Sequence, residues 1–360
     1  MRKTISIPMK FIGPLRITGS EINTEVHVPL ATYEFPLWPS VNRGASVSRY
    51  CEEGIRAFVL RDHMTRSIIL EADHASLLKN VVEDFNSRRA ELEQVIASTS
   101  QYTQLKSFHI QIIGNLLYVR WEACTGEASG HNMLTKAADA LITWLLKTYA
   151  NLRYVSISGN FCTDKKVSAV NSLLGRGKYV VADILVPRLI CRKRLKTTPE
   201  AIVNLHIKKN LIGSIVAGSL HSANAHFANM LLAFYLATGQ DAANIVEGSQ
   251  GITHTETRDG DLYFSVTLPN IIVGTLGSGK HLDFVEENIK GLGCHPTDRN
   301  TEKSARRLAI IIAATVLCGE LSLLAAQTNP GELMRAHDAF ERGNENYHEP
   351  TIKNRFTTVL

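Results

Sequence analysis

A short polar segment, residues 158–166, gathers several side chains with useful chemistry. It reads Ser-Gly-Asn-Phe-Cys-Thr-Asp-Lys-Lys, so the carboxylate of Asp164 stands beside the ammonium groups of Lys165 and Lys166. Such a set can bind a carboxylate or stabilise a developing oxyanion. A surface turn with a local ion pair would contain the same residues, and the spacing alone favours neither interpretation.

Two glycine-containing segments are candidates for binding a phosphate group. Residues 274–281 read Gly-Thr-Leu-Gly-Ser-Gly-Lys-His, which fits GxxxxGK but places His281 where a P-loop needs Ser or Thr. Residues 125–132 join an expected strand to an expected helix, where unpaired backbone N–H groups suit a pyrophosphate. An ordinary loop would look similar, and Glu127 is unfavourable beside an anion. Because residues 274–280 fit GxxxxGK, a P-loop-like nucleotide hydrolase is kept as a second, alternative function.

Four polar residues stand on or beside apolar elements: Glu34, His226, Asn229 and Asp241. Taken singly, each has an ordinary explanation. Asp241 follows Gly239 and suits a helix N-cap, and Glu34 suits an exposed position. Only their combination would indicate a site.

Composition excludes several classes of protein. The 360 residues are 44% hydrophobic and 20% charged, which is typical of a globular protein. The net charge of +5 is compatible with a small anionic ligand and gives no sign of nucleic-acid binding. The basic run at residues 192–196 has no interleaved aromatic residues, so we interpret it as a solvated face.

Metal binding, secretion and membrane insertion are not expected. The six cysteines form no CxxC pair and the histidines form no HExxH motif. The N-terminus has no apolar run of signal-peptide length. Residues 308–326 are long and apolar enough to span a bilayer, but Glu320 would cost about 2.5–3.5 kcal/mol there. We expect a buried helix and a reducing, cytoplasmic setting.

The order of expected elements predicts an inserted α+β unit at residues 67–157. Hydrophobic alternation predicts the strands, and helical spacing of apolar residues predicts the helices. Gly114 and Asn115 mark a hairpin turn. The strands are expected at residues 67–72, 106–113, 116–121 and 153–158, and the helices at 74–96 and 132–149. This β-α-β-β-α-β order is typical of the ferredoxin-like arrangement.

The flanking residues predict a large, mostly helical domain. Small and apolar residues form long expected helices at 212–238, ended by Gly239, and at 304–326. The expected fold class is therefore α+β. A large domain of residues 1–66 and 158–342 is interrupted by the small domain and followed by a polar tail, 343–360.

Taken in order, these segments resemble hydroxymethylglutaryl-coenzyme A reductase. The resemblance covers almost the whole chain, because several separate motifs occur in the family's order. They are residues 7–15, 158–166, 209–214, 224–229, 239–243, 274–279 and 319–324.

The resemblance implies a thioester reduction by two hydrides from NADPH, with NADH also possible. It implies hydroxymethylglutaryl-CoA as substrate, and mevalonate and coenzyme A as products. It also implies a homodimer or larger homo-oligomer whose active site forms between subunits, and a small domain that binds the cofactor.

The resemblance also assigns residues, each by its place in a motif. Lys165 would polarise the thioester oxygen, Asp241 would orient Lys165, Glu34 would donate a proton to the aldehyde intermediate, and His337 would protonate the leaving thiolate. The expected acyl-group contacts are Arg66, Ser158, Asp164, Lys166, Lys209 and Asn229. The expected coenzyme A contacts are Asn42, Arg43 and His226. The expected cofactor contacts are Gly126, Gly130, Asn132, Gly277, Gly279 and Arg342.

Several segments depart from the family pattern, among them the cofactor loop at residues 125–132. Glu34 is followed by the bulky Phe35 and Trp38 where most members have small residues, and Gln101 replaces an arginine associated with NADPH. A non-catalytic or altered-substrate paralogue is therefore a third hypothesis.

Overall fold

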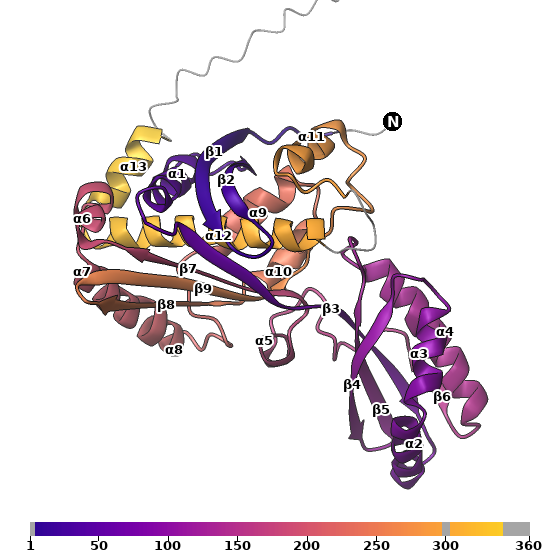
Figure 1. Ribbon diagram of the computed structural model, residues 1–360. Helices are drawn as coiled ribbons and strands as arrows, with labels where there is room; N and C mark the ends of the chain where they lie inside the picture. Colours follow the sequence, from indigo (N-terminus) through magenta and orange to yellow (C-terminus); the bar gives the residue numbers. More distant parts are fainter. Residues whose placement is uncertain (1–3, 297–302, 341–360) are drawn as a thin grey trace, which may run out of the picture.

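Figure 1 shows the computed structural model, which describes residues 4–296 and 303–340. A larger body contains the N-terminal strands and the long helix α12, and a smaller unit extends from it. Strand β3 (Ile55–Glu71) runs from one into the other.

The larger body is built on a mixed sheet whose strands follow the order β2-β1-β3-β7-β9-β8. Neighbouring strands are antiparallel except β1 and β3, which are parallel. Buried and half-buried positions alternate along much of β7, as expected for a strand with one face on a core. The other strands are β1 (Met9–Thr18), β2 (Asn23–Ala31), β7 (Gly177–Val186), β8 (Ile252–Arg258) and β9 (Asp261–Ile271).

Helix α12 (Lys303–Gln327) forms the centre of the main core. It packs against α1 (Leu37–Ser48), α9 (Phe227–Ala237) and strand β7. A Cβ on Gly44 would lie 2.1 Å from the carbonyl oxygen of Cys318, so glycine allows α1 and α12 to approach closely. By length and composition α12 resembles a membrane span, but it is almost wholly buried within the protein. The expected buried helix is confirmed.

The smaller unit has an antiparallel sheet in the order β4-β5-β3-β6. Its strands and helices share a second hydrophobic cluster. The expected hairpin is present, with Ile113 paired to Leu116 across the turn. The elements are α2 (Ala75–Ser87), α3 (Arg89–Ala97), β4 (Gln104–Ile113), β5 (Leu116–Cys124), α4 (His131–Thr148) and β6 (Arg153–Ser156).

Three details differ from the sequence-based expectation. The helix expected at 74–96 is two helices that meet at Arg88. The helix expected at 212–238 is interrupted between Val216 and Phe227, because Gly218 adopts a φ of +68° and the Asn224 side chain accepts from the backbone N–H of Phe227. The larger body contains a six-stranded path of sheet, so "mostly helical" understated its strands.

Short helices complete the larger body. They are α5 (Ala169–Leu174), α6 (Arg188–Ile190), η1 (Cys191–Leu195), α7 (Pro199–Leu205), η2 (His206–Gly213), α8 (Ser214–Val216), η3 (Ala242–Asn244), α10 (Ile245–Gly248), α11 (Asp283–Gly291) and α13 (Glu332–Phe340).

The core of the smaller unit gives a stability prediction. Trp121 is fully buried on β5, so Trp121→Ala is expected to lower the free energy of unfolding by about 3–5 kcal/mol. Ile113, at the exposed hairpin turn, is the matched control, and Ile113→Ala should change the free energy of unfolding by less than about 0.5 kcal/mol. Urea titration followed by circular dichroism measures both, and equal effects would contradict the assigned burial.

Candidate active site

The loop at residues 158–166 is fixed by contacts with the rest of the protein. The backbone N–H of Gly159 donates to the carbonyl of Ser67 at 2.9 Å, and that of Cys162 donates to the Ser67 hydroxyl at 3.0 Å. The backbone φ values of Asn160, Thr163 and Lys165 are 57°, 53° and 57°, a left-handed conformation that residues other than glycine rarely adopt. A plain surface turn would not need so many tertiary bonds.

Lys165 and Asp241 form the central ion pair. The Nζ of Lys165 lies 2.7 Å from Oδ2 of Asp241. The hydrogen bond that Lys165 donates to the Asp241 carboxylate raises the pKa of Lys165, so the ammonium form is favoured. Asp241 also caps η3, because its Oδ1 accepts from the backbone N–H of Ala243 at 3.1 Å. The two interpretations of Asp241, helix cap and site residue, are therefore compatible.

Asp164, next in sequence to Lys165, is bound on two sides. Arg176 Nη2 lies 2.6 Å from its Oδ1, and His131 Nε2 lies 3.6 Å away. Burial raises the pKa of Asp164, but the nearby His131 ring and the Arg176 guanidinium outweigh burial and hold that pKa well below its usual range. Asp164 is therefore an ionised part of the loop's framework.

Lys165, Asp241 and Asp164 line a pocket of about 500 Å³, here called the lysine pocket. One side is the N-terminus of α4, and another is the glycine-containing segment after β9. The two glycine-containing segments meet here: Ala128 bridges Leu276, and a Cβ on Gly274 would lie 2.4 Å from the backbone nitrogen of Ser129. The expected site residues in this pocket are Arg66, Gly130, Asn132, Asp164, Lys165, Asp241 and Gly277.

Two residues of these segments have structural partners that the sequence did not reveal. Lys280 donates to the carbonyl oxygens of Thr238 and Gly239 at 3.2 and 2.5 Å, and burial lowers its pKa to about 8. Glu127 is buried and accepts from the backbone N–H groups of Ser304 and Ala305 at the start of α12. Its carboxylate therefore binds the N-terminus of α12, a role that the sequence did not indicate.

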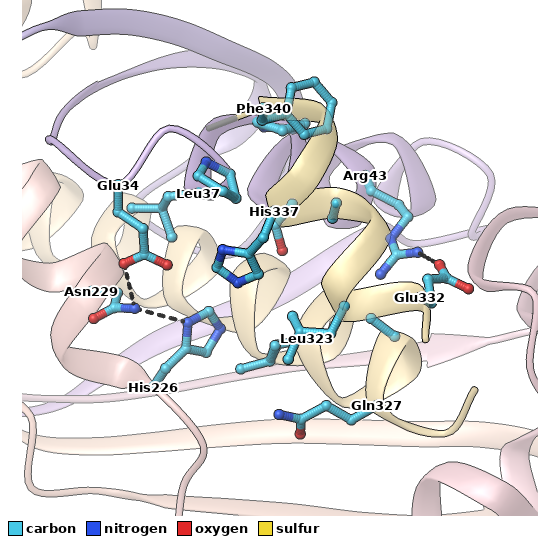
Figure 2. A pocket seen from close by; sticks show the side chains of 16 residues that line it. Glu34, Leu37, Arg43, His226, Asn229, Leu323, Gln327, Glu332, His337 and Phe340 are labelled. Carbon is cyan, nitrogen blue, oxygen red and sulfur yellow. Dashed lines mark hydrogen bonds and ion pairs between the residues drawn. The ribbon is translucent and has the colours of Figure 1, made fainter. Parts of the chain in front are cut away.

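Figure 2 shows a second pocket, of about 370 Å³, here called the glutamate pocket. Asn229 Nδ2 donates to Oε2 of Glu34 at 2.8 Å and lies 3.5 Å from Nδ1 of His226. His337, on α13, directs its ring toward the same space. Arg43 pairs with Glu332 at 2.7 Å on another side of the pocket.

A buried carboxylate, Glu320 on α12, positions the segment before α9. Its oxygens accept from the backbone N–H groups of Ala225 and His226 at 2.6 and 3.1 Å and from the Thr253 hydroxyl at 3.0 Å. His226 also places Nε2 3.0 Å from the carbonyl oxygen of Gly319. The His226 ring therefore has a fixed orientation at the glutamate pocket.

The remaining residues that the sequence predicted for the site lie outside these two pockets. Asn42 lines a neighbouring pocket with Lys10 and Trp38, and its Oδ1 accepts from the N–H of Gly13. The residues that line neither pocket are Gly126, Ser158, Lys166, Lys209 and Gly279. Arg342 lies outside the described residues. Among the described residues no group of three or more His, Cys, Asp or Glu side chains could hold a metal ion.

Sequence reasoning missed several residues that support the pockets. Arg176, Glu247 and Glu320 are buried and bind the site loops, but their partners are distant in sequence. The only available signal was chemical: each is a charged residue inside an otherwise apolar or glycine-rich stretch. The sequence also did not indicate that His131 contacts Asp164, whose Oδ1 lies 3.6 Å from Nε2 of that histidine.

Comparison with known proteins decides the family. The family model described as hydroxymethylglutaryl-coenzyme A reductase matches residues 3–342. The chain belongs to this family. It is 43% identical over 343 residues to the 3-hydroxy-3-methylglutaryl-coenzyme A reductase of Aeropyrum pernix, covering 94% of this chain and 80% of that one. The Pyrococcus abyssi reductase is 42% identical, with 94% and 83% covered.

A solved member of the family has the same fold. The class II reductase of Streptococcus pneumoniae, whose structure was determined bound to NADPH, superposes with a TM-score of 0.73 at 22% identity. The match covers 91% of this chain and 86% of that one. The family predicted from the ordered motifs is therefore confirmed, together with a mixed α/β fold.

The depressed pKa of Asp164 predicts a pH effect on stability. A carboxyl group whose pKa falls on folding stabilises the protein above its ordinary pKa of 3.8, and this contribution is lost as the pH falls through the folded value. Asp164→Asn should therefore be less stable than the parent at pH 6, and the difference should shrink below about pH 4. Urea midpoints at pH 6, 5, 4 and 3.5 measure this, and a constant difference would contradict it.

Proposed function

We propose that this chain reduces (S)-3-hydroxy-3-methylglutaryl-CoA to mevalonate and free coenzyme A. Two hydrides and two protons convert the thioester carbonyl, through an aldehyde, to a primary alcohol, and the thiol leaves after the first hydride transfer. The observation that carries the proposal is the Lys165–Asp241 ion pair in a pocket bounded by glycine segments, in a chain of the reductase family. A P-loop hydrolase is not favoured, because Lys280 is bonded to backbone carbonyls.

Lys165 supplies the positive charge that the reaction requires. Each hydride transfer places negative charge on the carbonyl oxygen, and a positioned ammonium stabilises that charge. Asp241 keeps Lys165 protonated, since its hydrogen bond raises the lysine pKa. Because this pairing exists before substrate binds, little reorganisation is needed during the reaction.

Glu34 and His337 are the proposed proton donors, the first to the aldehyde and the second to the leaving thiolate. Both line the glutamate pocket, and Asn229 orients the Glu34 carboxylate. The proposed acyl-group contacts are Arg66, Ser158, Asp164, Lys166, Lys209 and Asn229. The proposed coenzyme A contacts are Asn42, Arg43 and His226. The atypical residues Phe35 and Trp38 stack with ring centroids 5.4 Å apart and line a neighbouring pocket. Glu34 lines the glutamate pocket beside them.

The lysine pocket fits a nicotinamide dinucleotide, which supplies hydride when bound. Gly130 precedes the eighteen-residue helix α4 with a φ of 92°, leaving the helix N-terminus accessible to phosphate. The added Cβ of a side chain at Gly277 would meet nothing within 4 Å, and the buried Nε of Arg66 has no hydrogen-bond partner. The proposed contacts are Gly126, Gly130, Asn132, Gly277, Gly279 and Arg342. We propose NADPH, with NADH as the alternative.

The proposed domain division places the cofactor unit at residues 67–157. Its antiparallel order β4-β5-β3-β6, with connecting helices in one shared core, supports a ferredoxin-like inserted domain. Residues 1–66 and 158–342 would then form the substrate and coenzyme A domain, followed by the tail, 343–360. The six cysteines are scattered along the sequence without a CxxC pair, which supports the reducing, cytoplasmic location that we also propose.

We further propose a homodimer or larger homo-oligomer with active sites between subunits. Within one chain, Lys165 and Asp241 line one pocket whereas Glu34 and His337 line another, so a partner chain would complete the set. Lys209 lies on η2, and the following turns expose Ile212, Ile215 and Val216, with Ile215 77% and Val216 82% exposed. An apolar face of this kind suits a contact between copies.

The activity prediction uses one assay. Purified protein mixed with hydroxymethylglutaryl-CoA should oxidise NADPH or NADH, followed at the absorbance of the reduced nicotinamide. Lys165→Ala should lower kcat by about 10²–10³-fold, since it removes the group that stabilises the oxyanion. Lys193→Ala, in the solvated basic run, is the matched control and should keep full activity.

The same assay can overturn the proposal. Oxidation of neither cofactor, or full activity in Lys165→Ala, would exclude the proposed reductase mechanism. ATP hydrolysis that depends on Lys280 but survives loss of Lys165 would favour the P-loop hypothesis instead.

The assembly prediction concerns the exposed apolar turns. Ile215→Asp should shift the protein toward monomer in analytical ultracentrifugation, because a carboxylate would be desolvated in the contact, and activity should fall with it. Ile113→Asp, at the exposed hairpin turn of the smaller unit, is the control. A parent protein that sediments as an active monomer would contradict the proposed shared site.

A further inference from the structure

The backbone of Lys165, and not only its side chain, is bound by buried charged groups. We propose that Glu247 and Arg176 are positioning residues that fix the Lys165 backbone in its left-handed conformation, so that the ammonium lies against Asp241. This inference rests on the proposed role of Lys165. It adds two residues that neither the motifs nor the pockets identify.

Glu247 binds the main chain of Lys165. Its Oε1 accepts from the backbone N–H of Lys165 at 3.1 Å and from the Asn244 side chain at 3.0 Å. Glu247 is completely buried on α10, only six residues after Asp241. One short segment therefore presents two carboxylates to the same lysine, one to its main chain and one to its ammonium group.

Arg176 connects Glu247 to the loop and to strand β3. Its Nε lies 3.3 Å from Glu247 Oε1, and Nη2 lies 2.6 Å from Asp164 Oδ1. Its Nη1 donates to the carbonyl and hydroxyl oxygens of Thr65 at 2.6 and 2.8 Å. The planar guanidinium fixes these directions in a way that a lysine ammonium would not.

The loop needs this support because of its backbone conformation. Lys165 and Thr163 both have positive φ, where the Cβ of an ordinary residue is crowded against the backbone. Such conformations persist only where surrounding contacts impose them. Asn171 contributes by donating to the carbonyl of Thr163 at 3.1 Å, but the contact with Lys165 itself comes from Glu247.

The charges in this cluster also act on the lysine. Burial raises the pKa of Glu247, while the neighbouring Arg176 favours its ionised form. Glu247 in turn is one of the negative groups that raise the pKa of Lys165, after Asp241 and Asp164. Loss of Glu247 should therefore affect Lys165 in two ways, by releasing its backbone and by removing a nearby carboxylate.

The test compares three variants by two readouts. Glu247→Leu removes the acceptor, Glu247→Gln keeps an oxygen that can accept from the Lys165 N–H, and Glu21→Gln alters a carboxylate that binds Arg306 away from both pockets. The first readout is steady-state reduction of hydroxymethylglutaryl-CoA. The second is the pKa of Lys165, measured by competitive labelling of amines and mass spectrometry across pH.

Glu247→Leu should lower kcat by about tenfold or more, because small displacements of a catalytic group carry large rate effects. The KM for the thioester should change less than about threefold, because the substrate contacts are not removed. The labelling pKa of Lys165 should move down toward the ordinary value of 10.5. Glu247→Gln should recover part of both effects, and Glu21→Gln should change neither.

The results separate this inference from the proposed function. A parent protein without reductase activity would exclude the proposed function, while the labelling pKa would still decide the positioning role. An unchanged Lys165 pKa in Glu247→Leu, or unchanged kcat, would overturn the inference even if the melting temperature falls. If Glu247→Leu does not fold, Arg176→Lys decides in its place: it keeps the charge, and it should show the same lower kcat and lower Lys165 pKa.

Discussion

Strand β3 is hydrogen-bonded in two sheets, and the geometry of the candidate site depends on that continuity. Its first half pairs with β1 and β7, and its second half pairs with β5 and β6. The loop at residues 158–166 lies beside the point where β3 passes from one sheet to the other. There Ser67 accepts hydrogen bonds from two backbone N–H groups of the loop, and the carbonyl oxygen of Thr65 accepts one from the Arg176 guanidinium. Strand β3 therefore helps to fix the loop that carries Lys165.

Buried carboxylates organise the loops on both sides of the strand. Glu320 binds the backbone before α9, Glu247 binds the backbone of Lys165, and Glu127 binds the first turn of α12. A buried carboxylate without partners would be costly, but each accepts hydrogen bonds from backbone N–H groups that would otherwise lack acceptors. Irregular loops are thus given fixed shapes by charges placed in the core.

The sequence predicted those features that local patterns determine. The β4–β5 hairpin and helices α4 and α12 follow directly from hydrophobic spacing, and the ordered motifs identified the family. The break after Val216 was missed, because its apolar residues continue the helical pattern while Gly218 and Asn224 interrupt the backbone.

Contacts between distant residues were not accessible from local patterns. Arg176 and Glu247 are 71 residues apart, and neither spacing nor propensity indicates that they share a hydrogen bond. The contact of Glu127 with the start of α12 was not predicted for the same reason, since its partner Ser304 lies 177 residues later. The division of the expected residues between two pockets is likewise a property of the folded chain.

The left-handed conformation of Lys165 has a consequence for how this position responds to selection. Glycine adopts that conformation without crowding, so a library screened only for resistance to heat would enrich glycine at residue 165. The same substitution would delete the ammonium group that Asp241 orients. Thermal stability therefore favours glycine at residue 165, whereas catalysis requires lysine. A screen for heat-resistant variants of this protein must also select for enzymatic turnover.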